Sequence, residues 1–299
     1  MSTNETKQTD TGSSYNHVDR QWTRKLRVIA KEQPLGVMGV VLFLSMVVVA
    51  IGAPILAHQD IASTDMTKIF RPPSAENWFG TDHLGRDVWS RWVYGARLSL
   101  MVGLSAVVMA SVLGGFVGIA SGLIGGKFDL YIQRVFDAWM AMPSIVLAIV
   151  IMAALGTSLV NVIIAIAAVA FPRINRLTRS TAMSLKESLY VESAKIDGAS
   201  KLRIIVAHIA PNCLAPWMVY STALLGNMIL AEATLSFLGL GIPAPAASWG
   251  RDISENINNL YNAPWLAIFP GIGISLAVFA ANFIGDSVRD LVDPRLKKA

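Results

Sequence analysis

The chain has 299 residues, of which 54% are hydrophobic and 15% are charged, whereas an average soluble domain carries about 25% charged residues. The mean hydropathy of +0.51 excludes a water-soluble enzyme, because a fold of this size cannot bury so much apolar surface. The one cysteine, Cys213, excludes an internal disulfide and disfavours a thiolate metal site. The formal net charge of +5 is interpreted from where the charges lie, and not as a sign of nucleic-acid binding.

Charged residues are absent from five long stretches, residues 33–57, 98–126, 138–172, 204–231 and 256–285. Each stretch exceeds the about 20 residues that an α-helix needs to cross the hydrocarbon core of a bilayer. The polar turn Gly156-Thr157-Ser158 interrupts the third stretch, which predicts two helices there. The sequence therefore predicts an all-α integral membrane protein with six transmembrane helices, near residues 34–57, 99–123, 140–155, 159–171, 212–240 and 264–286.

Lysine and arginine are concentrated on one side of these spans. With the N-terminus inside, the inner segments hold 19 basic residues and the outer segments hold six, so the positive-inside rule predicts that both termini are cytoplasmic. The predicted organisation is a cytoplasmic polar and basic tail (1–33), an N-terminal transmembrane helix (34–57), an extracytoplasmic loop with an interfacial helix (58–98), a core with five transmembrane helices and a cytoplasmic loop at 172–211 (99–286), and a cytoplasmic C-terminal tail (287–299).

Two of the predicted spans carry a small residue at every fourth position. The second span has Ala106, Ala110, Gly114, Gly118, Gly122 and Gly126, and the sixth has Gly273, Ala277, Ala281 and Gly285. On a helix, each set forms a ridge with almost no side chain, which lets a second helix approach closely. The ridges are consistent with static packing in a helical bundle or with a sliding interface in a transporter.

Ionisable residues are almost absent from the predicted spans, and Glu232 is the exception. An acid at this depth indicates either a functional polar site or a structural hydrogen-bonding group, and a lone acid is too little for a proton relay. The four histidines do not cluster, so no metal site is predicted. The glycine-rich segment Gly122–Phe128 does not match a phosphate-binding loop, because Phe128 occupies the position where that motif needs Ser or Thr. No catalytic group, cofactor or enzymatic activity is predicted.

The cytoplasmic loop at 172–211 is the most informative segment. It is expected to form two short helices broken at Asp197-Gly198, since glycine permits the left-handed backbone that ends a helix. Ser200 is suited to cap the next helix, and Pro211 marks the entry to the fifth span. Such a helix–turn–helix is either a solvated surface or a docking surface for a cytoplasmic partner.

This loop resembles the "EAA" loop of ABC importer permeases. Glu192-Ser-Ala194, Gly198 and Pro211 match its spacing, with Ser193 in place of the first alanine. Two further segments, Gly80–Leu100 and Glu232–Gly250, are similar to the dipeptide/oligopeptide branch of that family. The length, the six spans and the extra N-terminal helix resemble its "C"-type permease subunit.

The resemblance implies a membrane subunit that works in a larger assembly. Permeases of this family pair with a second permease subunit, bind two cytoplasmic ATPase subunits and receive substrate from an extracytoplasmic binding protein. The residues that match the ATPase-docking coupling loop are Glu192, Ala194, Asp197, Gly198 and Ala199, followed by Pro211. Charged residues of the outer loops are candidates for contact with lipid phosphates or with the binding protein: Asp82, Arg86, Asp87, Asp252 and Glu255.

The function that the resemblance implies is ATP-driven import of dipeptides, oligopeptides or similar small solutes across the plasma (inner) membrane. ATP would be hydrolysed by the partner subunits. An alternative is a stand-alone secondary carrier centred on Glu232, and a weaker one is an intramembrane enzyme. A carrier would predict internal repeats and paired intramembrane charges, which the sequence does not have.

Overall fold

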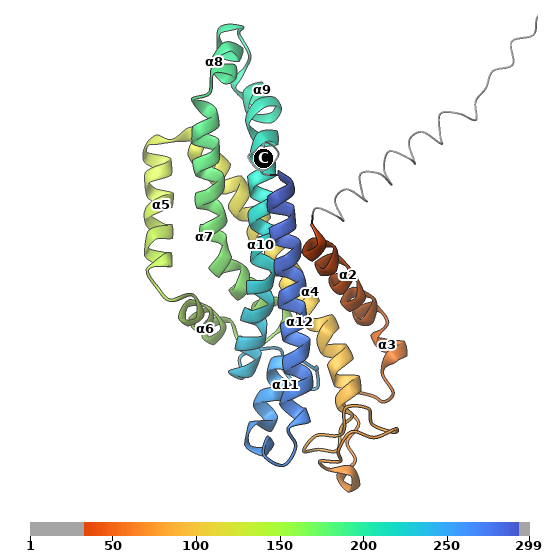
Figure 1. Cartoon of the computed structure of the whole chain (residues 1–299). Coiled ribbons are helices and arrows are strands. Elements are labelled where there is room, and N and C mark those ends of the chain that lie inside the picture. The colour runs from red at the N-terminus through yellow and green to blue at the C-terminus, as the bar shows by residue number, and fades with distance from the viewer. Residues whose placement is uncertain (1–32, 293–299) are drawn as a thin grey trace, which may run out of the picture.

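The computed structural model describes residues 33–292, and the predicted tails 1–32 and 293–299 lie outside them. Figure 1 shows an elongated helical bundle. The long helices are α2 (Pro34–Ile51), α4 (Val88–Ile124), α5 (Gly126–Met140), α6 (Ser144–Leu155), α7 (Leu159–Lys186), α10 (Ala210–Phe237) and α12 (Trp265–Val292). The short elements are α3 (Ala53–Leu56), α8 (Leu189–Ile196), α9 (Lys201–Arg203), α11 (Trp249–Asn256), the 3₁₀ turns η1 (Met66–Lys68) and η3 (Ile257–Asn259), and the π-helical turn η2 (Ile204–Ile209).

The described residues contain five helices that are long and apolar enough to cross a membrane, or six if the bent pair α5 and α6 forms one span. The predicted turn at Gly156 is confirmed: α6 ends there and the glycine has a φ of +78°. The span predicted near 140–155 is wrong, however. Its helix α6 has only residues 144–155 and qualifies as a span only together with α5, residues 126–140, which meets it at 96°. Pro143 stands at the start of α6. A proline cannot continue the ladder of a preceding helix and turns the residue before it away from helical geometry.

The sequence predicted an interfacial helix within 58–98. This prediction is wrong, because the structure has no separate helix at 80–97. Residues 80–87 form turns closed by a bridge between Thr81 and Asp87, and α4 begins at Val88 and continues without a break to Ile124. The Asp87 side chain caps α4 by accepting a hydrogen bond from the backbone N–H of Ser90. A capping aspartate of this kind satisfies one of the free N–H groups at a helix start.

The predicted cytoplasmic loop also begins later than expected. Pro172 lies inside α7, which continues to Lys186. Beyond the proline, Ile174 and Thr178 remain buried against α4. This packing outweighs the hydrogen bond that the proline removes, since most helix stability in a protein comes from the buried face. Similarly, α12 continues to Val292, past the predicted end at 286.

The small residues of α4 face α7 directly. A Cβ atom placed on Gly118 would lie 2.0 Å from Thr178 Oγ1 and 2.5 Å from the backbone oxygen of Asn175, and one on Gly122 would lie 2.7 Å from the backbone oxygen of Arg179. In α12, Gly285 approaches the backbone of Ala223 in α10 in the same way. The ridges therefore form close helix–helix contacts in this structure. Gly126 was predicted to belong to the ridge of the second span, but it begins α5 instead. A Cβ atom placed on it would have no neighbour within 4 Å.

We expect Gly118→Ala to destabilise the bundle, because the new methyl group would force α4 away from the backbone of α7. Overpacking of this kind costs about 1–3 kcal/mol. Gly271→Ala in α12 is the matched control, since nothing lies within 4 Å of that position and replacing a helical glycine by alanine is favourable by about 0.5–1 kcal/mol. Thermal unfolding of the purified protein in detergent measures both, and equal unfolding temperatures for the two variants would contradict this packing.

Candidate functional site

The loop between α8 and α9 folds into a defined turn at one end of the bundle (Figure 1). Gly198 has a φ of +79°, a conformation that favours glycine. Its N–H donates to the Lys195 oxygen at 3.1 Å, and the N–H of Ala199 donates to the Ala194 oxygen at 3.0 Å. These two bonds form a Schellman motif, which ends α8 sharply. The predicted break at Asp197-Gly198 is confirmed.

The inner face of this turn is apolar and anchored on the ends of the long helices. Val191 of α8 is fully buried in a cluster with Ile119 of α4, Ala182 of α7 and Ile209 of η2. Ala194 and Ala199 pack against the same cluster. The two alanines of the matched motif therefore hold the turn on the bundle, and their small size permits the close approach.

The outer face of the turn exposes large apolar side chains. Leu189 and Ile196, seven residues apart and thus on one side of α8, are each 81% exposed. Leu202 and Val206 are also exposed, at 70% and 61%. We refer to these four residues as the apolar tip. Large apolar side chains exposed on a short element that also carries charged residues indicate an interaction surface.

A pocket of about 510 Å³ lies beside the apolar tip, at the ends of α4 and α7. Three of its lining residues are lysines, Lys186, Lys195 and Lys201, and the others are apolar: Leu123, Ile124, Val191, Ile204, Ile205 and Ile209. Lys186 Nζ also donates to the Leu123 oxygen at 2.8 Å, which satisfies a free carbonyl at the end of α4. The pocket adds positive charge to the apolar surface of the turn, without an acidic residue in its lining.

At the opposite end of the bundle, charged residues of the loops that were predicted to be extracytoplasmic pair with one another, although they are far apart in sequence. Arg91 Nε donates to Asp252 Oδ1 at 2.9 Å, and this pair is nearly fully buried. Arg86 bridges Asp82, at 2.5 Å, and Glu255, at 2.8 Å. The network joins the segment before α4 to α11, and so it closes this end of the fold into one lobe. We call it the outer lobe, after the side on which its loops were predicted to lie.

Of the five outer residues considered for contact with a binding protein, four have buried side chains. As whole residues, Asp82, Arg86, Asp87 and Asp252 are each at most 7% exposed. Only Glu255 keeps an appreciable surface, with 23% of its side chain exposed. Any direct contact of the four with a partner would require the lobe to open, and their pairing instead shapes the surface that the lobe presents.

The carboxylate of Glu255 is held ionised by this network. Burial alone would raise its pKa, but hydrogen bonds from Arg86 and Arg251 outweigh that effect and lower the pKa from 4.5 to about 2. A folded-state pKa below the unfolded value gives stability that is present above the unfolded pKa and lost as the pH falls. The pairing therefore contributes its full stability above pH 4.5 and loses it between pH 4.5 and about 2.

We therefore expect the unfolding temperature of the wild type to fall as the pH is lowered from about 5 to about 3. Glu255→Gln removes this titrating group and should make that part of the curve shallower, with a lower starting stability at pH 7. The measurement is thermal unfolding in detergent as a function of pH. A variant curve parallel to the wild-type curve over this range would contradict the pairing of Glu255 with Arg86 and Arg251.

Glu232, the predicted intramembrane acid, is fully buried. Its carboxylate accepts hydrogen bonds from the hydroxyl groups of Ser99 (2.6 Å), Ser236 (2.7 Å) and Ser248 (2.9 Å). These serines come from α4, α10 and the residue before α11. The glutamate thus ties two membrane helices to the outer lobe. The serine partners could not be found from the sequence, because two of them come from other segments of the chain.

Comparison with known proteins decides the family. Residues 110–298 match the family of binding-protein-dependent transport system inner membrane components. The chain belongs to this family. A dipeptide transport system permease of Alkalihalophilus pseudofirmus is 45% identical over 267 residues, which cover 89% of this chain and 88% of the relative. An oligopeptide transport system permease of Bacillus subtilis is 35% identical over 268 residues, covering 90% and 88%. A glutathione transport system permease of Escherichia coli is 37% identical over 268 residues, covering 89% and 88%.

Family membership confirms that this binding-protein-dependent permease is a multi-pass inner membrane protein. It is a transport component and not itself an enzyme. A binding-protein-dependent system implies an ATPase and a binding protein as partners. The matched residues 110–298 include the turn at Gly198, the long helix α10 and the α11 side of the outer lobe.

Proposed function

We propose that this permease carries peptides, or similar small amide-containing solutes, into the cytoplasm as a subunit of an ATP-driven importer. The similarity to permeases of dipeptide, oligopeptide and glutathione transport systems supports this substrate class. All three solutes contain amide bonds and span a range of lengths. The family relationship also favours a subunit of an assembly over a stand-alone carrier centred on Glu232.

The apolar tip is the observation that supports ATPase docking. Its exposed side chains would leave water when the turn seats on a cytoplasmic ATPase, and each large aliphatic group buried there contributes about 1.5–3 kcal/mol. Glu192 and Asp197 are exposed beside the tip and are available to pair with basic groups of the ATPase. Ala194, Gly198 and Ala199 would act indirectly, by fixing the shape of the turn, and Pro211 lies in the first turn of α10, which follows it.

The assembly that we propose contains this chain, a second permease subunit and two ATPase subunits. The turn continues through α9 and η2 into α10 as one helical segment from Lys201 to Phe237. Closure of the ATPases would displace the apolar tip, and the helical segment would transmit the displacement toward Glu232 and the outer lobe. Lipid would contact the exposed apolar faces of the spans.

The orientation that we propose places both termini in the cytoplasm. The apolar tip and the described end of α12 lie at the same end of the bundle, and α11 lies at the other end (Figure 1). The excess of basic residues on the inner segments supports the same orientation. A binding protein would then meet the outer lobe, whose surface is shaped by Asp82, Arg86, Asp87, Asp252 and Glu255.

The test of this function is uptake of a radiolabelled dipeptide by cells in which the gene for this chain has been deleted. We expect uptake to be lost and then restored by the wild-type chain. Excess unlabelled di- or tripeptide should compete, whereas the corresponding free amino acids should not. Uptake that is unchanged by the deletion, or that free amino acids abolish equally, would contradict the peptide class.

A further inference from the structure

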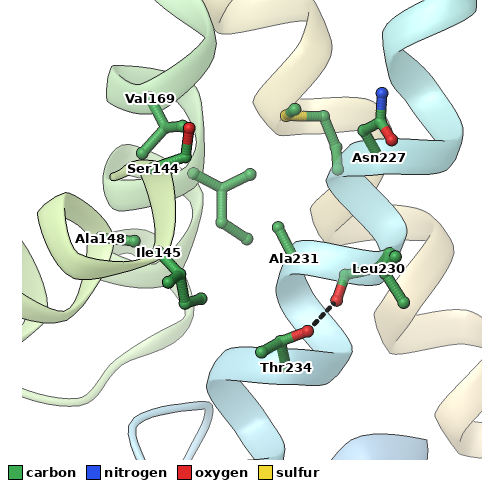
Figure 2. Close-up of a pocket in the computed structure, with 10 residues that line it drawn as sticks. Ser144, Ile145, Ala148, Val169, Asn227, Leu230, Ala231 and Thr234 are labelled. Carbon is green, nitrogen blue, oxygen red and sulfur yellow. Dashed lines mark hydrogen bonds between the residues drawn. The ribbon is translucent and has the colours of Figure 1, made fainter. Parts of the chain in front are cut away.

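A groove of about 350 Å³ lies between α6, α7 and α10, and all the residues that line it come from these three helices. Figure 2 shows Ser144, Ile145 and Ala148 of α6 across the groove from Ala231 and Thr234 of α10. The remaining lining residues are Ile166, Val169, Asn227, Met228 and Leu230. The wall contains no charged side chain, and its polar groups are those of Ser144, Asn227 and Thr234.

The groove lies at the depth of the hydrocarbon core. Ile166 and Val169 belong to the uncharged part of α7 that ends before Arg173, and Asn227 belongs to the uncharged stretch 204–231. Next to it, Gly226 faces Asn282 and Val278 of α12, which also belong to an uncharged stretch. Asn227 therefore lies inside the membrane, yet its side chain is exposed on the isolated chain.

An exposed asparagine at this depth is unfavourable against lipid. A primary amide without hydrogen-bond partners in an apolar medium costs several kcal/mol, and no hydrogen bond joins the Asn227 amide to the described part of the chain. Polar side chains within spans accordingly face the interior of an assembly or a water-filled cavity. The position of Asn227 therefore identifies the groove as a surface that faces the inside of the transporter.

We propose that this groove is one wall of the solute path and that Asn227 binds the backbone amide groups of the transported peptide. This inference rests on the proposed function. A primary amide side chain carries both donors and an acceptor, which match the N–H and C=O of a peptide group. The Thr234 hydroxyl donates to the Leu230 oxygen at 2.8 Å, so it is left as an acceptor. The Ser144 hydroxyl accepts from Arg173 Nη2 at 2.8 Å, so its proton is free to be donated.

The neutrality of the wall has a consequence for specificity. Hydrogen bonds to the peptide backbone are common to all peptides, whereas a charged wall would select for side chains or termini. The lining residues themselves therefore do not select peptides by side-chain charge. The Arg173 guanidinium, which is hydrogen-bonded to Ser144, adjoins the wall and would favour an acidic group near it.

Cysteine accessibility tests whether the groove faces water. Cys213 is the one cysteine of the chain and is buried, so Cys213→Ala provides a background for single cysteines in the assembled complex. We expect a charged, membrane-impermeant thiol reagent to modify Asn227→Cys at least about tenfold faster than Phe279→Cys, because charged reagents do not enter lipid. Phe279 is 55% exposed on α12, and Tyr261→Cys, 98% exposed in a loop, is the fully accessible control. Modification of Asn227→Cys no faster than of Phe279→Cys would overturn the proposal.

Dipeptide uptake by substituted complexes tests the hydrogen bonds. Asn227→Leu keeps the size and removes the polar groups, so we expect uptake to fall about tenfold, as for the loss of one to two kcal/mol of hydrogen bonding, while Asn227→Gln retains part of it. The amount of ATPase bound to the complex should not change. Full uptake by Asn227→Leu would overturn the proposal, whereas a wild-type complex that assembles without transporting any peptide would refute the proposed function instead.

Discussion

Replacing Gly198 by valine should release the ATPase subunits from the complex. Gly198 has a φ of +79°, and a residue with a Cβ atom in this left-handed region is strained by about 1–2 kcal/mol, more when it is β-branched. The strain would undo the Schellman motif between Ala194 and Ala199, so that Ile196 and Leu202 no longer form one surface. We expect most of the bound ATPase, and with it the ATP-dependent uptake, to be lost.

The control for this substitution is Gly156→Val. Gly156 also ends a helix, and nothing lies within 4 Å of a Cβ atom placed on it. Its φ of +78° and ψ of 172° lie in a region that only glycine adopts readily, so valine there strains the backbone at least as much as at Gly198. It lies between α6 and α7, away from α8. The measurement is the ratio of ATPase to permease in the purified complex. A normal ratio in Gly198→Val, or an equal loss in Gly156→Val, would contradict a docking role for the turn.

Breaking the buried pair of Arg91 and Asp252 should destabilise the outer lobe. Their side chains are only 3% and 10% exposed, and removal of one partner leaves an uncompensated buried charge, which costs about 3–5 kcal/mol. Arg91→Met and Asp252→Leu are each expected to lower the unfolding temperature strongly. Import should fall with them, because in the proposed orientation the lobe forms the surface that meets the binding protein.

The double variant Arg91→Met/Asp252→Leu separates the pair from the individual side chains. An apolar pair of similar volume can replace a buried ion pair with little loss, so the double variant should recover most of the stability that either single variant loses. Thermal unfolding of the three variants and the wild type gives the coupling energy directly. Losses that simply add in the double variant would show that the two side chains act independently.

The family, five of the predicted spans and the turn at Gly198 could be predicted from the sequence, because each depends on a local pattern. Uncharged stretches give the spans, and a glycine between two short helices gives the break. The spacing of Glu192, Ala194 and Gly198 has the same local character. These features require no knowledge of how distant segments pack.

The features that sequence reasoning missed depend on contacts between distant segments. The 96° bend between α5 and α6 and the passage of α7 through Pro172 reflect packing that outweighs local preference. The hydrogen-bond partners of Glu232 could not be predicted, since Ser99 lies 133 residues away in the sequence. The charged residues at 82–91 and 252–255 were expected to be exposed, because charged side chains usually are. Arg91 and Asp252 are instead buried as a pair, although 161 residues separate them in the sequence.

The apolar tip was missed although a signal was present. Leu189 and Ile196 are large aliphatic residues at a seven-residue spacing in an otherwise polar loop. Such a spacing places both on one side of a short helix. Considered together with the matched motif, it would have indicated which side of α8 faces a partner.

The central claim, that the apolar tip docks an ATPase, is tested most directly by photo-crosslinking in membranes. A photoreactive amino acid is introduced at Ile196 or Leu189, and the crosslinked protein is identified by mass spectrometry. The control position is Ile55, which is 87% exposed in α3. We predict that both tip positions crosslink to a subunit that carries a nucleotide-binding phosphate loop and that Ile55 does not. Crosslinks to lipid alone from both tip positions, in a complex that still imports peptide, would contradict this account.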